Sequence, residues 1–173
     1  KNYKRAIFVN PEDTHTMSNK LFCMAANRIY SSDIYLKEAR VFNELLQKKR
    51  RYIYTSWSNV NAKSRLRIGF VSADLNDHPV GYLLEGLLKN SDPAKIEFLA
   101  FSNSTKISPQ TKKIKPFFKE WHSIISLADK DAAAIIFKSS VDVLIDLSGH
   151  TGGNRLSVFS YRPAPVQATW FGY

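Results

Sequence analysis

The chain has 173 residues, of which 44% are hydrophobic and 23% charged, and its net charge is +10. This composition is typical of a soluble globular protein with room for one ordinary domain and an appendage. No run approaches eighteen apolar residues and no signal-peptide core opens the chain, so we expect no membrane contact and a cytoplasmic location. The single cysteine, Cys23, excludes an internal disulfide and fits a reducing compartment.

The basic excess lies in the first third of the chain. Residues 1–67 hold fourteen Lys and Arg against five Asp and Glu, whereas residues 68–173 hold eleven against ten. The densest run, residues 48–51, ends a predicted helix, where cations are favoured because the last carbonyls point outward. We interpret this run as a solvated helix end. A phosphate-binding patch is the alternative, and nucleic acid is disfavoured as a partner.

Residues 12–49 have the periodicity of two helices joined by a short polar link. The first helix, residues 18–30, is apolar around Cys23, which we expect to be a packed core thiol. The second, residues 31–49, starts with three cap candidates and carries one apolar face, formed by Tyr35, Ala39, Phe42, Leu45 and Leu46. The pair predicts an α-helical hairpin, which is also how a helical repeat array can end. Residues 55–65 predict a linker.

From Leu66 onward, short apolar runs alternate with helical runs. Strands are predicted at residues 65–75, 95–103, 118–125, 141–149 and 164–173, and helices at residues 81–91, 127–140 and 154–162. This alternation predicts right-handed crossovers and a parallel sheet, and a strand apolar on both faces fits a sheet covered on both sides. The expected fold class is therefore α/β, a Rossmann-like parallel sheet preceded by the helical hairpin.

In such a sheet, ligands bind in the crevice at the carboxyl ends of the strands. The loop after the first predicted strand reads SADLNDHPVG. Pro79 disfavours the α region at His78 and is itself favoured at the first helical position, so His78 is predicted at the helix N-cap, just after Asp77. The positive helix end biases the imidazole toward its neutral form, which suits a general base or a contact to a substrate hydroxyl. A helix cap without chemistry is the alternative.

The loop after the fourth predicted strand reads SGHTGGNR. His150 and Thr151 are predicted to face the crevice, and Arg155 to hold a phosphate or a carboxylate beside the free N–H groups of the next helix. Three glycines, Gly149, Gly152 and Gly153, let the backbone turn tightly and approach a ligand closely. The loop matches neither the dinucleotide nor the phosphate-loop pattern, so a plain glycine turn capped by Asn154 is the alternative.

Other chemistries lack their residues. No G-x-S-x-G motif is present, which excludes the usual serine hydrolase, and the histidines and the cysteine lack metal-ligand spacing, so no metal is expected. In the fourth predicted strand, Asp142 and Asp146 share a face. We expect Asp146 to be a strand-end site residue and Asp142 to be a strand-start residue.

Two long segments resemble a known family. Residues 66–88, LRIGFVSADLNDHPVGYLLEGLL, and residues 141–173, VDVLIDLSGHTGGNRLSVFSYRPAPVQATWFGY, resemble the amino-terminal lobe of protein O-GlcNAc transferases and their SPINDLY-type relatives. The run RPAPVQATWFGY is the most specific piece. Residues 11–46 resemble the segment that joins tetratricopeptide repeats to the catalytic region. The resemblance thus divides the chain into a helical linker, residues 1–64, and a lobe, residues 65–173.

The resemblance implies the first lobe of a two-lobed GT-B type glycosyltransferase with its active site between the lobes. The family transfers GlcNAc from UDP-GlcNAc, with inversion, to Ser or Thr hydroxyls of proteins, and needs neither a metal nor a cofactor. By position, His78 matches a histidine that faces the crevice, a candidate base or a contact to acceptor or sugar. The substrate-binding residues implied are Asp77, Pro79, His150, Thr151, Gly152, Gly153, Arg155 and Gln167, the last in the R-P-A-P-x-Q run.

The chain also departs from the family. Family members continue past WFGY into a second lobe that holds most of the nucleotide-sugar site, so we expect this chain to be inactive alone and to self-associate through an exposed lobe face. SPINDLY-type members use GDP-fucose, and the SGHT sequence looks closer to bacterial and SPINDLY-type relatives, so the donor sugar stays open. A non-catalytic module, in which the basic helical pair binds a partner, is the remaining alternative.

Overall fold

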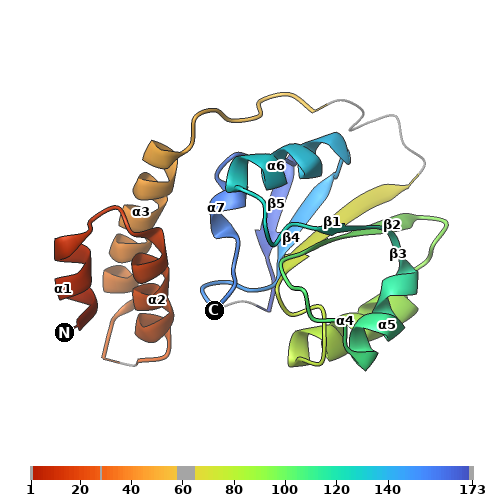
Figure 1. The fold of residues 1–173 in the computed structure, drawn as a ribbon, viewed down its shortest axis with the longest axis horizontal. Helices are drawn as coiled ribbons and strands as arrows, with labels where there is room; N and C mark the ends of the chain where they lie inside the picture. Colours follow the sequence, from red (N-terminus) through yellow and green to blue (C-terminus); the bar gives the residue numbers. More distant parts are fainter. Residues whose placement is uncertain (1, 28, 58–64, 172–173) are drawn as a thin grey trace.

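The computed structural model describes residues 2–27, 29–57 and 65–171, in which three helices precede a five-stranded sheet with further helices between its strands (Figure 1). The helices and strands, in chain order, are α1 (Asn2–Val9), α2 (Thr14–Ala25), α3 (Ser32–Lys49), β1 (Leu66–Ser72), α4 (Pro79–Lys89), β2 (Ile96–Ser102), α5 (Pro109–Ile114), the 3-10 turn η1 (Lys115–Phe117), β3 (Phe118–Ser123), α6 (Asp129–Lys138), β4 (Val143–Asp146), α7 (Leu156–Phe159) and β5 (Val166–Thr169).

The sheet is parallel throughout, with strand order β3-β2-β1-β4-β5. The α/β fold class and the five strands predicted from the apolar runs are therefore confirmed. The chain builds outward from β1 through β2 to β3, and then returns across the sheet to place β4 on the other side of β1. This reversal makes the carboxyl ends of β1 and β4 the topological switch point, where ligands of such sheets bind.

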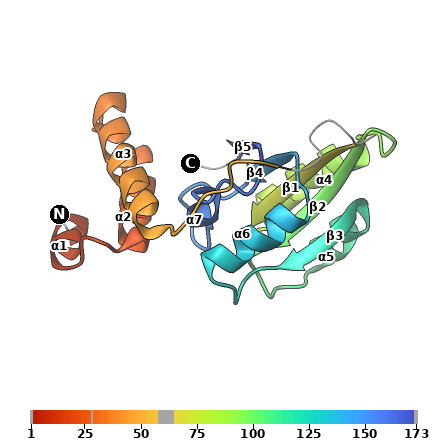
Figure 2. The ribbon, with the colours of Figure 1, turned by 90° about the horizontal axis from the view of Figure 1, so that it is seen from above.

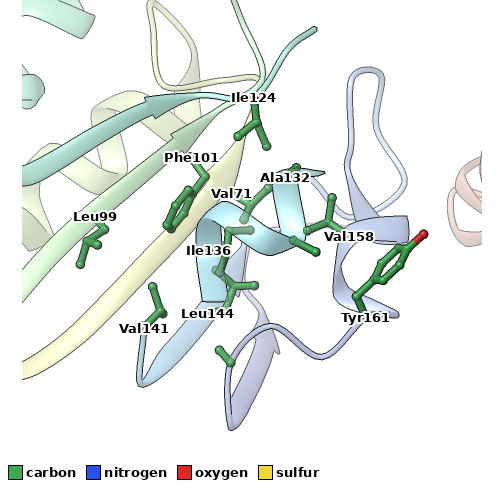
Figure 3. Close-up of a cluster of buried hydrophobic side chains, with 12 residues drawn as sticks. Val71, Leu99, Phe101, Ile124, Ala132, Ile136, Val141, Leu144, Val158 and Tyr161 are labelled. Atoms are coloured by element: carbon green, nitrogen blue, oxygen red, sulfur yellow. The ribbon is translucent and has the colours of Figure 1, made fainter. Parts of the chain in front are cut away.

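Helices cover both faces of the sheet. Strand residues alternate between the two sides, so that Phe70 packs under α4 and α5, whereas Val71 packs under α6 and α7. Figure 3 shows the second of these clusters, with Val71, Phe101 and Leu144 meeting Ile136 of α6. This two-sided burial explains why the strands are nearly continuous apolar runs.

A glycine in β1 lets one of these faces close tightly. A Cβ built on Gly69 would lie 2.8 Å from the ring of Phe101 and 3.1 Å from side chains of Leu144 and Val141. Real Cβ atoms essentially never lie within 3.0 Å of another heavy atom, so the Phe101 ring would have to move, and well-packed cores relax only partly around added volume. Gly69 is therefore a packing requirement of the sheet beneath α6.

The helical hairpin is confirmed as α2 and α3. Asp13 caps α2 through bonds from the amides of His15 and Thr16, so this helix begins at Thr14, earlier than the predicted residue 18. The hairpin buries an apolar cluster made of Met17, Leu21, Phe42, Leu45 and Leu46. The packed position predicted for Cys23 is wrong. Its thiol is exposed, because the buried stripe of α2 runs through positions 17, 21 and 24 instead.

The hairpin stands beside the sheet, next to α7, in both views of the ribbon (Figures 1 and 2). The chain leaving α3 is held along α6 and α7. The Arg50 guanidinium donates to the Ser160 carbonyl at 2.8 Å, and the Tyr54 amide donates to the Tyr161 carbonyl at 2.9 Å. The Tyr54 ring stacks on Phe137 with 3.9 Å between centroids. Of the predicted linker at 55–65, residues 58–64 lie outside the described residues.

Two helices were not expected from the sequence. One is α1, which buries none of its described residues. The other is α5, which lies between the second and third predicted strands and begins with a capping box between Ser108 and Thr111 and with Pro109 in its first turn. Only six residues long, α5 packs one face inward with Ile114 at its end, and this is too short to produce a helical period in the sequence.

Candidate functional site

The candidate functional site is the edge of the sheet where the loops after β1 and β4 meet. Because β1 pairs with β4, the buried hydroxyls of Ser72 and Ser148 approach to 3.4 Å, and the Leu147 amide donates to the Val71 carbonyl at 3.1 Å. The loop after β2 joins them, since the side-chain amide of Asn103 donates to the Gly153 carbonyl at 2.8 Å. The two loops singled out from the sequence are thus brought together.

His78 is the N-cap of α4, as predicted. Its backbone is extended, with φ −146° and ψ 151°, and Pro79 follows as the first residue of the helix. The imidazole is half-buried, and its Nδ1 accepts the amide of Val80 at 3.3 Å. A nitrogen that accepts a hydrogen bond carries no proton, so the neutral ring carries its proton on Nε2. In this conformation Nε2 is a hydrogen-bond donor, which favours a contact to a substrate oxygen over the role of base.

Asp77 ties this loop to α5. Its Oδ1 accepts the Gln110 amide at 3.1 Å and the Tyr82 hydroxyl at 3.3 Å. The nearby carboxylate raises the pKa of Tyr82. The carboxylate of Asp77 therefore links the first turns of α4 and α5. Its predicted contact with substrate stays a prediction.

Gly81, in the first turn of α4, is a residue whose role sequence reasoning missed. A Cβ at this position would lie 2.3 Å from the backbone oxygen of Asn76. The same Asn76 is buried and donates from its side chain to the Ala73 carbonyl at 2.9 Å. The glycine thus lets the first turn of α4 press against the loop that carries His78.

Asp146, at the end of β4, organises the second loop from below. Its carboxylate is buried and accepts the amides of Ser148 and Gly149 at 3.1 and 2.8 Å and the Thr169 hydroxyl at 2.9 Å. Burial raises the pKa of Asp146, and these hydrogen bonds oppose that rise. Each of its oxygens therefore has a partner within the chain, which gives it a supporting position under the loop.

The loop from Gly149 to Asn154 depends on its glycines. Gly149 and Gly153 have φ values of 54° and 75°, in the left-handed region. The loop closes on itself, because the Thr151 hydroxyl donates to the Ser148 carbonyl at 2.7 Å and the side-chain amide of Asn154 donates to the Thr151 carbonyl at 2.8 Å. Gly152 is exposed, and a Cβ there would meet no other atom within 4 Å. Its backbone is thus open to a ligand.

His150 is turned toward the helical hairpin. Its Nδ1 lies 2.9 Å from the hydroxyl of Ser18 in α2, and its ring meets Phe42 of α3 edge-on, with 5.3 Å between centroids. Burial lowers the pKa of His150. The predicted substrate contact therefore stays a prediction, and the contact that the structure places on Nδ1 is with the hairpin.

Arg155 binds the surrounding loops together. Its guanidinium pairs with the carboxylate of Asp129 at 2.9 Å and donates to the Asn103 side chain at 3.1 Å. Two further bonds reach the carbonyls of Ile124 and Leu127, at 2.7 and 2.9 Å. Nε also donates to Asp129, at 3.0 Å, so the guanidinium makes four hydrogen bonds within the described residues out of its five N–H donors. The structure pairs Arg155 with Asp129 of the chain itself, and the predicted contact with a phosphate or carboxylate of a ligand stays a prediction.

Gln167 lies on β5, opposite Leu144 of β4. Its side-chain nitrogen donates to the Phe159 carbonyl at 3.0 Å, while its side-chain oxygen is buried and has no hydrogen-bond partner within the described ranges. The residue therefore fastens α7 to the last strand. Its predicted contact with substrate is not tested by these contacts.

A cavity of about 330 Å³ lies where the hairpin meets the loops after β2, β3 and β4. Its walls are mostly polar, and no sequence pattern indicates that these residues gather, because they come from five separate segments. The lining residues are Thr14, His15, Ser18, Phe42, Asn103, Ile125, Leu127, Ala128, Asp129, Gly153, Asn154, Arg155 and Ser157.

Two further classes of site can be checked over the part of the chain that the structure describes. There, histidine, cysteine and carboxylate side chains form no group of three or more that could hold a metal ion. Within the same residues, no helix has the length and apolar character that crossing a bilayer requires. The expectation that the reaction needs no metal remains a prediction from the resemblance.

The parallel sheet, its switch point and the loops above it define a Rossmann-like lobe docked on a helical hairpin. Residues 14–173 match glycosyl transferase family 41, and the chain belongs to that family.

Curated relatives carry the same lobe inside longer chains. The probable UDP-N-acetylglucosamine–peptide N-acetylglucosaminyltransferase SPINDLY of Hordeum vulgare is 31% identical over 170 residues, which are 95% of this chain and 18% of that protein. The UDP-N-acetylglucosamine–peptide N-acetylglucosaminyltransferase of Caenorhabditis elegans is 30% identical over 129 residues, 72% of this chain and 11% of that protein. The chain thus spans less than a fifth of the length of these relatives.

A solved structure has the same arrangement. A mutant of the O-GlcNAc transferase of Thermobaculum terrenum aligns with a TM-score of 0.79 and 28% sequence identity, over 98% of this chain and 32% of that one. The similarity covers the hairpin as well as the lobe.

Proposed function

We propose that this chain is the first lobe of a two-lobed glycosyltransferase that transfers GlcNAc from UDP-GlcNAc to Ser or Thr hydroxyls of proteins. The observation that carries the proposal is that the loop with His78 and the glycine loop follow adjacent strands, β1 and β4, at the switch point of a family 41 lobe. The nucleotide sugar would be held mainly by a second lobe facing this edge. A cytoplasmic location and independence of metals and cofactors belong to the same proposal.

The residues of this lobe then have separate tasks. In an inverting transfer the acceptor hydroxyl attacks the anomeric carbon, loses its proton, and the nucleoside diphosphate leaves from the opposite face. His78 donates from Nε2 to an oxygen of the acceptor or the sugar, because its Nδ1 is occupied by the helix amide. The proton of the acceptor therefore goes to another group. Asp146 and Arg155 hold the loops in place from the buried side.

GDP-fucose is a second candidate donor. The feature that favours it is the sequence of the loop after β4, Ser148 to Thr151, which resembles SPINDLY-type relatives. The two donors differ in nucleotide and sugar, and both would meet the same edge of this lobe. The test must therefore offer both to one protein preparation.

The test uses the complete protein that carries this chain, incubated with acceptor protein and either labelled UDP-GlcNAc or labelled GDP-fucose. We expect label on Ser or Thr residues from UDP-GlcNAc, mapped by mass spectrometry, with the same rate in the presence of a chelator. The 173-residue chain alone should transfer nothing. Transfer only from GDP-fucose would replace the proposed donor. A folded protein that labels nothing from either sugar would favour the non-catalytic interaction module.

A further inference from the structure

Ser18 connects the helical hairpin to the glycine loop of the candidate site. It lies in α2 and only 4% of its surface is exposed. Its hydroxyl oxygen lies 2.9 Å from Nδ1 of His150 and accepts the side-chain amide of Asn154 at 3.2 Å. One buried hydroxyl thus contacts the loop between β4 and α7 near both of its ends, although 132 residues separate Ser18 from His150.

The direction of these hydrogen bonds follows from the inventory of donors. The side-chain nitrogen of Asn154 can only donate, so its hydrogen bond takes a lone pair of the Ser18 oxygen. The hydroxyl proton needs an acceptor because the group is buried, and His150 Nδ1 is the acceptor that the described contacts offer. The chain of bonds therefore runs from Asn154 through Ser18 to His150, and it leaves the imidazole proton on Nε2.

Apolar contacts reinforce the same junction. Phe42 of α3 meets the His150 ring edge-on at 5.3 Å, and Leu156, directly after the loop, packs against the apolar cluster of the hairpin. The loop itself contains several glycines, and glycine imposes few conformational limits of its own. The hairpin therefore supplies restraints that the sequence of the loop lacks.

We propose that Ser18, His150 and Asn154 are positioning residues, through which the helical hairpin fixes the loop from Gly149 to Arg155 in the conformation that sugar transfer requires. The hydrogen bonds and the ring contact carry the structural part of this inference, and its catalytic part rests on the proposed function. The hairpin thus belongs to the site, because a change in its position would shift the loop through the hydrogen bonds of the Ser18 hydroxyl.

The test compares Ser18→Ala with Asn19→Ala in the complete protein. Asn19 is the adjacent residue of α2 and is exposed, which makes it a matched control. Measured by hydrogen exchange and mass spectrometry, peptides over residues 147–159 should exchange about fivefold faster or more in Ser18→Ala, while peptides over β1 and β2 stay unchanged. Asn19→Ala should match the wild type, and Ser18→Thr, which keeps the hydroxyl, should restore slow exchange.

Kinetics separate positioning from mere stability. With UDP-GlcNAc as donor, Ser18→Ala should lower kcat about fivefold or more and leave the KM for UDP-GlcNAc within about twofold, because the donor is held mainly by the other lobe. His150→Phe keeps the contact with Phe42 and removes the hydrogen bond, so it should give the same kcat loss, and the double variant should lose no more than either one.

The proposal would be overturned if hydrogen exchange in the loop stayed at the wild-type rate in both Ser18→Ala and His150→Phe. It would also be overturned if exchange became faster while kcat stayed unchanged. A wild-type protein with no transfer activity would instead refute the proposed function, and the exchange experiment would still test the junction. If Ser18→Ala does not fold, His150→Phe provides the same comparison.

Discussion

Replacing His78 separates its role as a helix cap from its role in chemistry. Nδ1 accepts the Val80 amide, which is the task of an N-cap side chain. His78→Ala removes that acceptor, which costs about 1 kcal/mol of the free energy of unfolding. Asparagine is among the best N-cap residues, so His78→Asn should keep wild-type stability within about 0.5 kcal/mol.

The two variants should nevertheless lose activity alike. Neither carries a donor at the position of Nε2, and loss of one hydrogen bond that stabilises the transition state lowers kcat by about 10- to 1,000-fold, or about 1.4–4 kcal/mol. The assay is transfer from UDP-GlcNAc by the complete protein, with urea denaturation of each variant alongside. If His78→Asn turns over at the wild-type rate, His78 is a cap and our assignment of Nε2 as a donor is wrong.

Three further predictions concern the same lobe. Gly153→Ala should lower the free energy of unfolding by about 1–2 kcal/mol, because Gly153 has a φ of 75° and the new Cβ would lie 2.9 Å from the Cβ of Ala73. Gly152→Ala, where the new Cβ meets no other atom, should lower it by less than about 0.5 kcal/mol. Equal urea midpoints for the two variants would contradict this prediction. Burial lowers the pKa of His150, so as pH falls below about 6.5 the unfolded chain binds a proton that the folded chain resists, and stability falls. His150→Phe should lack this contribution to the loss of stability at acid pH. If the free energy of unfolding of the wild type and of His150→Phe, measured by urea denaturation, depended on pH in the same way, the prediction would be wrong. The isolated chain should self-associate in sedimentation velocity through the edge strand β5, and Trp170→Lys should weaken this association; a monodisperse monomer at high concentration would count against it.

The sequence predicts what depends on local rules. His78 was placed at a helix start because proline restricts the residue before it, and this restriction acts between neighbours. The strands were found because residues buried on both faces of a sheet leave long apolar runs, as in β4. The switch point then follows from connecting parallel strands through helices, so the place of the candidate site was predictable as well.

The rest depends on contacts between distant segments. Cys23 lies in an apolar stretch, and only the position of α3 and α1 decides that Leu21 and Met24 turn inward while the thiol stays outside. The sequence of the loop predicts that His150 faces the crevice, because it contains no sign of the contact with Ser18, which lies 132 residues away. Arg155 was expected to bind a ligand because a sequence does not show that Asp129 already occupies its guanidinium.

Residues 50–57, which follow α3, decide where the chain can be cut into a helical part and a lobe. Three consecutive carbonyls, at residues 160–162, receive donors from Arg50, Tyr54 and Trp57. With the stacked ring of Tyr54, these contacts contribute about 2–6 kcal/mol to the lobe. A recombinant lobe cut at residue 65, where charge and pattern change, would leave those carbonyls and Phe137 uncovered. Domain shuffling in this family, in the laboratory or in evolution, should therefore carry residues 50–57 along with the lobe.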